Sequence, residues 1–287
     1  MNVKGDKDMN MKRILAVLLT LLMAATLLYG CGDTGSQGKV LRVGMECAYA
    51  PYNWTQPTNA NGAVPIKDSS NYAYGYDVMM AKYLAEKIGY TLEIHKIDWD
   101  GLPLAVQTGA IDCVIAGQSI TAERLESVDF TKPYYYASIV CLVLANGPYA
   151  SATGISSFSG AKCTSQISTV WYTVCLPQIP GADIQPATET APAMLVALTS
   201  GAVDLVVTDM PTAMAAVSVY PQLKLLDFSD ADDGFQVSDE EINIGISLQK
   251  GNKDLLDKLN DALSGLTVAD FERMMNDAIK VQPLSED

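Results

Sequence analysis

One stretch of the sequence combines residue types that bind an anion: Gly109–Arg124, which reads GAIDCVIAGQSITAER. Ile111–Ile115 is apolar on both faces apart from Asp112, a pattern typical of a strand buried in a parallel sheet. Thr121 is then a predicted helix N-cap, which places free backbone N–H groups and the guanidinium of Arg124 near the carboxyl end of that strand. Unpaired N–H donors, the helix dipole and a planar guanidinium all attract a carboxylate. The stretch therefore predicts a site for a small acidic group, with an ordinary solvated helix arginine as the alternative.

The same order of elements recurs further along the chain. Residues 104–117 and 195–209 both predict a helix, a glycine that ends it, a short strand and a polar turn. Two copies indicate two similar halves, each able to form an α/β sheet, rather than a solenoid array. Ligands of open α/β sheets bind outside the carboxyl ends of strands, where one copy presents Arg124 and the other Asp209. A cation and an anion that face each other across a cleft suit a zwitterion.

The N-terminal residues predict export and lipid attachment. A basic pair precedes Ile14–Leu28, an apolar run that is too short for a membrane-spanning helix and typical of the hydrophobic part of a signal peptide. Leu28-Tyr-Gly-Cys31 resembles a lipobox, the site at which bacterial lipoproteins are cleaved and lipidated on cysteine. We therefore expect a signal peptide over 1–31 and an exported chain anchored through Cys31 to the outer, or periplasmic, face of the cell membrane.

Composition and cysteine spacing exclude several kinds of chemistry. A formal net charge of −14 excludes nucleic acid as a partner and disfavours direct contact with anionic lipid. The cysteines after Cys31 show neither CxxC nor metal-like spacing, so we expect mostly buried thiols and no metal site or cofactor, with one disulfide left open. The single histidine, His95, lies on a strand pattern, so a Ser-His-Asp triad has little support.

Further candidate residues follow the predicted strands. Glu46 and Tyr49 come directly after the first strand, in a loop position where ligand contacts concentrate. Tyr76 lies at the start of a helix that Asp77 is expected to cap and Gly89 to end. Two aromatic side chains that flank a cleft can sandwich a flat or cationic group, although simple rim packing is the alternative.

The chain is expected to cross between two lobes twice. A continuous apolar run over 138–144 predicts one hinge strand, and residues 243–248 predict its returning partner. The predicted first lobe therefore comprises 32–137 and 244–287, and the second lobe comprises 138–243. Two C-terminal amphipathic helices should pack back on the first lobe.

The order and spacing of several short motifs resemble the family 3 solute-binding proteins of polar amino acid ABC importers. These motifs are Tyr49-Ala-Pro-Tyr52, Gly75-Tyr-Asp77, Trp99-x-x-Leu102, Gly109-x-Ile-Asp112, Ser119-x-Thr-x-x-Arg124, Asp129-Phe-x-x-Pro-Tyr134 and Val203-Asp…Asp209. The resemblance spans residues 40–280 and implies an α/β, two-lobe type II periplasmic-binding-protein fold with two hinge strands. It further implies a monomer that is not an enzyme, that closes on a free amino acid and that works with the membrane permease subunits of an ABC importer.

The resemblance also implies a role for each candidate residue. The arginine at Arg124 grips the α-carboxylate of the ligand, and the aspartate at Asp209 holds the α-ammonium. Tyr49 and Tyr76 enclose the ligand side chain, and Glu46 stands where binders of basic amino acids place a carboxylate. The complete set of expected ligand contacts is Glu46, Tyr49, Tyr76, Ala116, Gly117, Ser119, Arg124, Gln166, Ser168, Thr169 and Asp209.

Some positions depart from the family pattern, and other functions stay open. Ser168 and Val170 replace a usual glycine and threonine, and Ala116 replaces a frequent serine, so backbone donors are expected to serve there. Because a carboxylate in a closed cleft needs a cation, Glu46 favours arginine, lysine or histidine, with glutamine or another neutral polar amino acid as the alternative. Cyclohexadienyl dehydratases use the same fold, and a surface sensor or adhesin is a third possibility.

Overall fold

The computed structural model describes residues 38–283 of the 287-residue chain. The chain divides into two units, Met1–Gly38 and Lys39–Asp287, and the described helices and strands belong to the second. The predicted signal peptide and Cys31 lie outside the described residues. Within 38–283, no helix has both the length and the apolar character needed to cross a membrane.

The first lobe is built on a five-stranded sheet with the order β6-β1-β7-β16-β8. Strand β1 runs parallel to β6 and β7, whereas β16 is antiparallel to β7 and β8. The strands are β1 (Val40–Met45), β6 (Thr91–Lys96), β7 (Cys113–Val114), β8 (Val128–Phe130) and β16 (Ser247–Gln249). A smaller sheet in the order β2-β3-β5-β4 contains β2 (Ala48–Tyr49), β3 (Asn53–Gln56), β5 (Tyr72–Tyr74) and β4 (Val64–Pro65).

Helices cover this lobe, and local signals define several of their ends. The helical segments are η1 (Ala60–Gly62), α2 (Tyr76–Ile88), η2 (Trp99–Gly101), α3 (Leu102–Gln107), α4 (Ala122–Ser127), α8 (Lys253–Leu263) and α9 (Val268–Val281). Gly89 ends α2 in the left-handed conformation, and the Thr121 hydroxyl caps α4 by accepting from Arg124 N at 3.2 Å, as the sequence predicts. The cap predicted at Asp77 is wrong, because Gly75 holds the N-cap position of α2.

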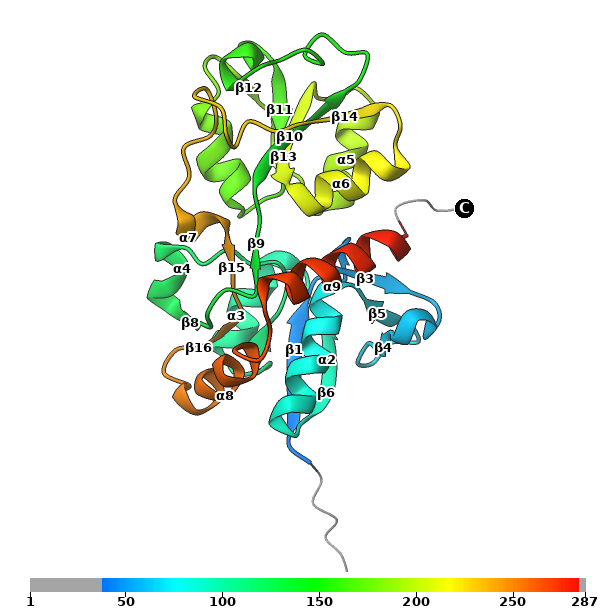
Figure 1. Ribbon diagram of the computed structural model, residues 1–287, viewed down its shortest axis with the longest axis vertical. Helices are drawn as coiled ribbons and strands as arrows, with labels where there is room; N and C mark the ends of the chain where they lie inside the picture. The colour runs from blue at the N-terminus through cyan, green and yellow to red at the C-terminus, as the bar shows by residue number, and fades with distance from the viewer. Residues whose placement is uncertain (1–37, 284–287) are drawn as a thin grey trace, which may run out of the picture. The chain divides into compact units, whose positions relative to one another are not determined.

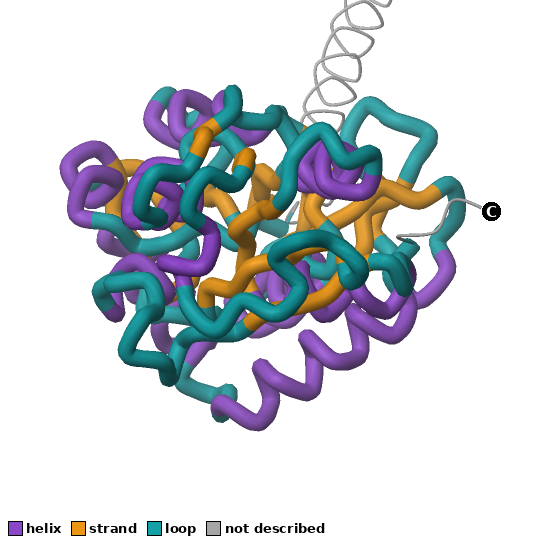
Figure 2. Tube along the Cα trace, turned by 90° about the horizontal axis from the view of Figure 1, so that it is seen from above, coloured by secondary structure: helices purple, strands orange, loops and turns teal. Residues whose placement is uncertain are grey.

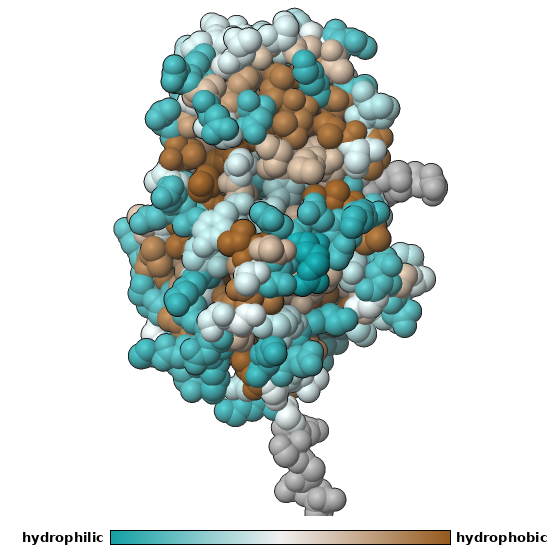
Figure 3. Space-filling view, viewed as in Figure 1, coloured by the Kyte–Doolittle hydropathy of each residue, from teal (hydrophilic) through white to brown (hydrophobic). Residues whose placement is uncertain are grey.

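The second lobe contains a five-stranded mixed sheet with the order β12-β11-β13-β10-β14. Its strands are β10 (Ile139–Leu144), β11 (Lys162–Thr164), β12 (Asp183–Ile184), β13 (Leu205–Asp209) and β14 (Leu223–Leu226). Its helical segments are η3 (Ile155–Phe158), η4 (Trp171–Cys175), η5 (Leu176–Gln178), α5 (Ala191–Thr199) and α6 (Met210–Val219). Figure 2 shows strands enclosed between helices, and Figure 3 shows apolar surface on the face that carries α5 and α6.

Two short strands carry the chain between the lobes (Figure 1). Strand β9 (Tyr135–Tyr136) pairs antiparallel with β15 (Asn243–Ile244), which follows the short helix α7 (Asp239–Ile242). The predicted pairing of 138–144 with 243–248 is wrong, because β10 pairs with β13 and β14 inside the second lobe. A run that is apolar on both faces is typical of a central strand, and β10 is buried along most of its length.

The predicted helix-glycine-strand repeat is present in both lobes. In the first lobe α3 is followed by Gly109 and β7, and in the second lobe α5 is followed by Gly201 and β13. Both glycines have a positive φ, 74° in each case, which lets the chain turn from the helix into the strand. The carboxyl ends of β7 and β13 therefore lead into the polar turns that carry the candidate site.

The described cysteines are buried free thiols, as most of them were expected to be. Cys47, Cys113, Cys141, Cys163 and Cys175 form no disulfide with one another. Burial raises the pKa of the Cys47 thiol to about 12, so this group stays protonated and unreactive at neutral pH. His95 bonds to Glu93 through Nε2 at 2.8 Å, in keeping with a structural role.

Candidate functional site

Two adjoining cavities lie between the lobes. The inner cavity has a volume of about 20 Å³ and is lined by Glu46, Tyr49, Trp99, Gly117, Ser119, Arg124, Gln166, Thr169, Val170 and Trp171. The outer chamber has a volume of about 690 Å³, and its lining includes Asp100, Gln118, Glu123, Ser168, Glu240 and Glu241. Four residues line both cavities, namely Trp99, Arg124, Thr169 and Val170. Most of the predicted site residues therefore meet at the inner cavity, which has room for about one water molecule.

Arg124 provides a cation between the two cavities. Its guanidinium donates to the carbonyl oxygens of Ser119 and Ser168, each at 2.8 Å, and lies 5.6 Å from the centre of the Trp99 ring. Burial lowers the pKa of Arg124 to about 10, and no carboxylate among the described residues forms a salt bridge with it. A guanidinium held by carbonyl oxygens alone retains its charge at neutral pH and can bind an anion.

Glu46 provides an anion on the inner cavity. It follows the last residue of β1 and is 5% exposed, and its carboxylate accepts from Gln166 Nε2 at 3.2 and 3.3 Å. Burial raises the pKa of Glu46 to about 7, and the described residues include no salt-bridge partner for it. Removal from water makes this carboxylate costly, so a cationic ligand group beside it is favourable.

Tyr49 and Asp209 form a hydrogen bond across the lobes. The Tyr49 hydroxyl donates to the Asp209 carboxylate, and the Tyr49 ring stacks on Tyr52 with centroids 4.7 Å apart. Asp209 is the last residue of β13, is 2% exposed, and caps α6 by accepting from Thr212 N at 2.8 Å. Burial raises the pKa of Asp209 to about 6. The Asp209 side chain does not line the inner cavity, so a ligand ammonium would reach it only by replacing the Tyr49 hydroxyl.

Tyr76 and Ala116 do not take the places expected of them. Tyr76 is fully buried, its ring stacks on Tyr134 at 5.7 Å, and its hydroxyl donates to the Tyr134 carbonyl oxygen. The first turn of α2 faces the core, so Tyr76 does not line the inner cavity in this structure, and its contact with a ligand side chain stays a prediction. Ala116 is 1% exposed and also lies outside the lining of the inner cavity.

The loop after β11 brings the second lobe to the cavity. Gln166 and Thr169 line the inner cavity, whereas Ser168 lines only the outer chamber. Ser168 has a positive φ of 57°, which is the left-handed region where glycine is usual. This conformation would suit a glycine, and it places the Ser168 carbonyl oxygen within hydrogen-bond distance of Arg124.

Two tryptophans in the lining of the inner cavity were missed as site residues. Trp99 follows β6 and Trp171 begins η4. A signal for Trp99 was present, because β6 is parallel to β1 and its carboxyl end must lie at the same edge of the sheet as Glu46 and Tyr49. For Trp171 the sequence offers no comparable signal, since it lies in a short π-helical segment that no periodicity predicts.

Three buried carboxyl groups make the stability of the ligand-free protein depend on pH. Burial raises the pKa of Glu46 and Asp77 to about 7 and that of Asp209 to about 6, well above their values in an unfolded chain. The folded protein therefore binds more protons between about pH 4 and pH 7, so the free energy of unfolding should decrease as pH rises through this window and level off above it. A group contributes about 1.4 kcal/mol for each pH unit that separates its pKa values in the folded and unfolded states. The titration of Glu46 alone should therefore lower the free energy of unfolding by roughly 3 kcal/mol across this window.

Urea unfolding from pH 4.5 to pH 8 measures this effect. Glu46→Gln removes one of the titrating groups, so the stability difference between variant and wild type should grow as pH rises. An exposed glutamate on α2, Glu86, provides the matched control, and Glu86→Gln should leave the difference constant. If the free energies of unfolding of Glu46→Gln and wild type differ by the same amount at pH 5 and pH 8, the raised pKa of Glu46 is contradicted.

Comparison with known proteins identifies the family. The model of the bacterial extracellular solute-binding proteins, family 3, matches residues 41–270. The chain belongs to this family, and the fold described above is its two-lobe, type II periplasmic-binding-protein fold.

Individual relatives differ in the ligand for which they are named. A probable histidine-binding protein of Campylobacter jejuni is 27% identical over 235 residues, which cover 78% of this chain and 85% of the relative. The L-cystine-binding protein TcyJ of Escherichia coli is 25% identical over 256 residues, which cover 88% of this chain and 88% of the relative. A solved amino acid ABC transporter substrate-binding protein of Streptococcus pneumoniae, bound to L-arginine, is 25% identical with a TM-score of 0.72, over 84% of this chain and 94% of that one.

Proposed function

We propose that this protein is the substrate-binding component of an ABC amino acid importer and that it captures a basic amino acid, arginine, lysine or histidine. The observation that carries the proposal is the pair of charges on the inner cavity. Arg124 has no carboxylate partner and Glu46 has no cationic partner among residues 38–283, yet both line the same small cavity. An amino acid with a carboxylate at one end and a cationic side chain at the other satisfies both.

The aromatic lining supports the same class of ligand. Tyr49, Trp99 and Trp171 surround the cavity, and aromatic faces attract guanidinium, ammonium and imidazolium groups by roughly 0.5–2 kcal/mol each. Two relatives are named for histidine and cystine, and a solved relative is bound to L-arginine, and each of these ligands has an α-carboxylate and an α-ammonium. In this proposal Arg124 binds the α-carboxylate of the ligand, and Asp209 binds the α-ammonium after its hydrogen bond to the Tyr49 hydroxyl has broken.

Ligand entry requires the lobes to separate. A cavity of about 20 Å³ does not hold an amino acid, and Tyr49 covers Asp209 in this arrangement. The β9 and β15 pair provides two crossing segments about which the lobes can open and then close on the ligand.

Binding without catalysis is the better account of the acidic residues. A general acid/base mechanism requires two groups that face the same ligand. In the proposed binding mode Glu46 and Asp209 each pair with a cationic group of the ligand, so both carboxylates are used in binding and neither is left to transfer a proton. In the proposed setting the protein is exported and lipid-anchored at Cys31, and it delivers its ligand to the permease subunits of the importer.

The ligand preference is tested by competition and by Glu46→Gln. If the proposal is correct, the variant should bind arginine roughly thirtyfold or more weakly, because one partner of a buried charge pair is lost. Its affinity for glutamine should change by no more than about threefold, because a neutral side chain gains little from the charge. Calorimetry on wild type and variant measures both values. The assignment is wrong if glutamine displaces a bound probe from wild type at lower concentration than arginine, lysine and histidine all do.

A further inference from the structure

A chain of buried hydrogen bonds runs through the first lobe and joins two of its turns. Asp77 lies at the centre: its Oδ1 accepts from the Tyr134 hydroxyl and its Oδ2 from Asn53 Nδ2, each at 2.7 Å. At one end of the chain, Gly117 N donates to the Tyr134 hydroxyl at 3.0 Å. At the other end, Cys47 N donates to Asn53 Oδ1 at 2.7 Å. The two turns are therefore connected through one carboxylate.

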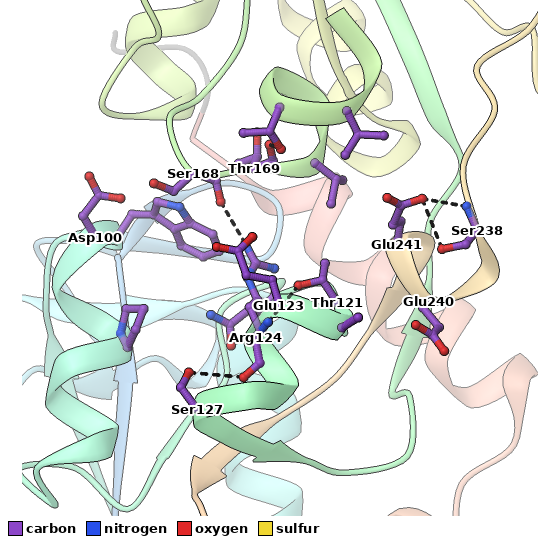
Figure 4. Close-up of a pocket in the computed structure, with 17 residues that line it drawn as sticks. Asp100, Thr121, Glu123, Arg124, Ser127, Ser168, Thr169, Ser238, Glu240 and Glu241 are labelled. Atoms are coloured by element: carbon purple, nitrogen blue, oxygen red, sulfur yellow. Dashed lines mark hydrogen bonds between the residues drawn. The ribbon is translucent and has the colours of Figure 1, made fainter. Parts of the chain in front are cut away.

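The three side chains in this chain of bonds stand behind the site and not at its surface. Asn53, Asp77 and Tyr134 are fully buried and line neither the inner cavity nor the outer chamber. The side chains that Figure 4 shows around Arg124 belong to the outer chamber instead. Any effect of the three on a ligand must therefore act through the turns that they hold.

Both turns carry residues of the inner cavity. Cys47 directly follows Glu46 and has a positive φ of 54°, which is unusual for a residue with a side chain. Gly117 lines the inner cavity, and a Cβ atom at this position would lie 2.6 Å from Tyr49 Cε1. The turn at Gly117 and the ring of Tyr49 are thus in close contact, so a small shift of either turn changes the shape of the cavity.

The directions of these hydrogen bonds require a carboxylate at the centre. A backbone N–H can only donate, so Asn53 turns its carbonyl oxygen to Cys47 N and its NH2 group to Asp77. The Tyr134 hydroxyl accepts from Gly117 N, and its single proton points to Asp77. Two donors therefore meet Asp77, and only an ionised carboxylate accepts at both oxygens without a proton of its own to place. An asparagine there would set its NH2 group against one of the two donors.

Tyr134 also connects this chain of bonds to the segments that cross between the lobes. Its backbone N donates to the Ile244 carbonyl oxygen at 2.8 Å, and Ile244 belongs to β15. Its carbonyl oxygen accepts from the Tyr76 hydroxyl, and its ring stacks on that of Tyr76 with an interplanar angle of 10°. The main chain and the ring are both fixed, so the Tyr134 hydroxyl is a rigid acceptor for the turn at Gly117.

We propose that Asp77 and Tyr134 are positioning residues of the ligand site. Through their hydrogen bonds they hold the turns at Cys47 and Gly117 in one relative position, which places Glu46 on the inner cavity. The inference deepens the proposed function and rests on it for the identity of the ligand. Asp77 controls both turns, whereas Tyr134 controls only the turn at Gly117. The two residues should therefore affect ligand selectivity differently.

Calorimetry with arginine and glutamine tests this difference at pH 8, above the pKa of about 7 to which burial raises Asp77. Tyr134→Phe keeps the ring and removes the hydroxyl, so it should weaken both ligands by a similar factor of roughly ten. Asp77→Asn also releases the turn that follows Glu46, which acts on the cationic ligand alone. Arginine should therefore lose about threefold or more in affinity relative to glutamine in this variant.

The matched control is Tyr83→Phe, which removes a buried hydrogen bond of the same lobe. The Tyr83 hydroxyl donates to the Ala262 carbonyl oxygen at 3.2 Å, between α2 and α8, and Tyr83 lines neither cavity. This variant should bind arginine and glutamine as wild type does.

Hydrogen exchange followed by NMR tests the same bonds without any ligand. In Asp77→Asn the amides of Cys47 and Gly117 should exchange about tenfold faster or more than in wild type, relative to the amides of β6 in the same lobe. In Tyr134→Phe only the Gly117 amide should do so, and in Tyr83→Phe neither should. If Asp77→Asn does not fold, Tyr134→Phe, which keeps the packing of the ring, is used for both measurements.

The two measurements separate a positioning role from a purely structural one. Folded Asp77→Asn and Tyr134→Phe proteins with wild-type affinities for both ligands, and only a lower midpoint of thermal unfolding, overturn the proposal. Wild-type exchange rates of the Cys47 and Gly117 amides in these variants overturn it as well. A wild-type protein that binds neither arginine nor glutamine refutes the proposed ligand class instead, while the exchange rates still decide whether Asp77 and Tyr134 hold the turns.

Discussion

Replacement of Arg124 by alanine is expected to weaken binding of the amino acid by a factor of roughly thirty to several thousand, the equivalent of about 2–5 kcal/mol. The guanidinium is held by the carbonyl oxygens of Ser119 and Ser168 and has no carboxylate partner among the described residues, so its charge is available to the ligand. Arg124→Lys should recover only part of the loss, because an ammonium lacks the planar fork that fits a carboxylate. Calorimetry on the purified variants measures the effect.

An exposed arginine on α9 provides the control for this experiment. Arg273 forms a surface pair with Asp270 and is not part of the lining of either cavity, so Arg273→Ala should bind the ligand as wild type does. Near-normal affinity in a folded Arg124→Ala protein would show that the α-carboxylate is not bound at this position.

The Asp209→Asn substitution is expected to cause a loss of similar size, because the amide cannot balance the charge of the ligand α-ammonium. Asparagine is as good an N-cap as aspartate, so the bond to Thr212 N and the start of α6 should survive. The loss should therefore appear in ligand affinity rather than in the midpoint of thermal unfolding. Calorimetry and circular dichroism on the same sample measure the two quantities.

A ligand without an α-amino group tests the role of Asp209 directly. Such a compound should bind wild type poorly and lose little further in Asp209→Asn, since the missing group is the one that Asp209 holds. Asp204 accepts from Lys162 N, the first residue of β11, at 2.9 Å, and Asp204→Asn provides the matched control in the same lobe. Equal losses for ligands with and without the amino group would instead assign Asp209 a purely structural role.

The sequence predicts the features of this fold that depend on a few neighbouring residues. Thr121 caps α4 and Gly89 ends α2 because both effects act within one helical turn. The helix-glycine-strand repeat is predicted for the same reason, and the positions of Glu46 and Tyr49 follow from the end of β1.

The errors lie where packing between distant segments decides the outcome. Asp77 has the residue type of an N-cap, but it is fully buried and accepts hydrogen bonds from Asn53 and Tyr134 instead. Tyr76 is held inside by the same Tyr134, which arrives from a segment more than fifty residues later in the chain. The apolar composition of residues 138–144 predicts that this strand is buried. It does not predict that the strand pairs with β13 and β14, because the pattern within one strand does not specify which strands lie beside it.

The hydrogen bonds that join the lobes also compete with the ligand. Three bonds cross between the lobes: Tyr49 to Asp209, Gln166 to Glu46, and Arg124 to the Ser168 carbonyl oxygen. Each bond involves one charged side chain, that of Asp209, Glu46 or Arg124, and these are the groups proposed to bind the amino acid. Molecules closed by these bonds cannot admit a ligand, so the apparent dissociation constant rises in inverse proportion to the open fraction. A substitution such as Tyr49→Phe can therefore tighten binding even though it deletes a contact. Because Glu46, Arg124 and Asp209 take part both in these bonds and in the proposed ligand contacts, a substitution at any of them should change the affinity and the open fraction together.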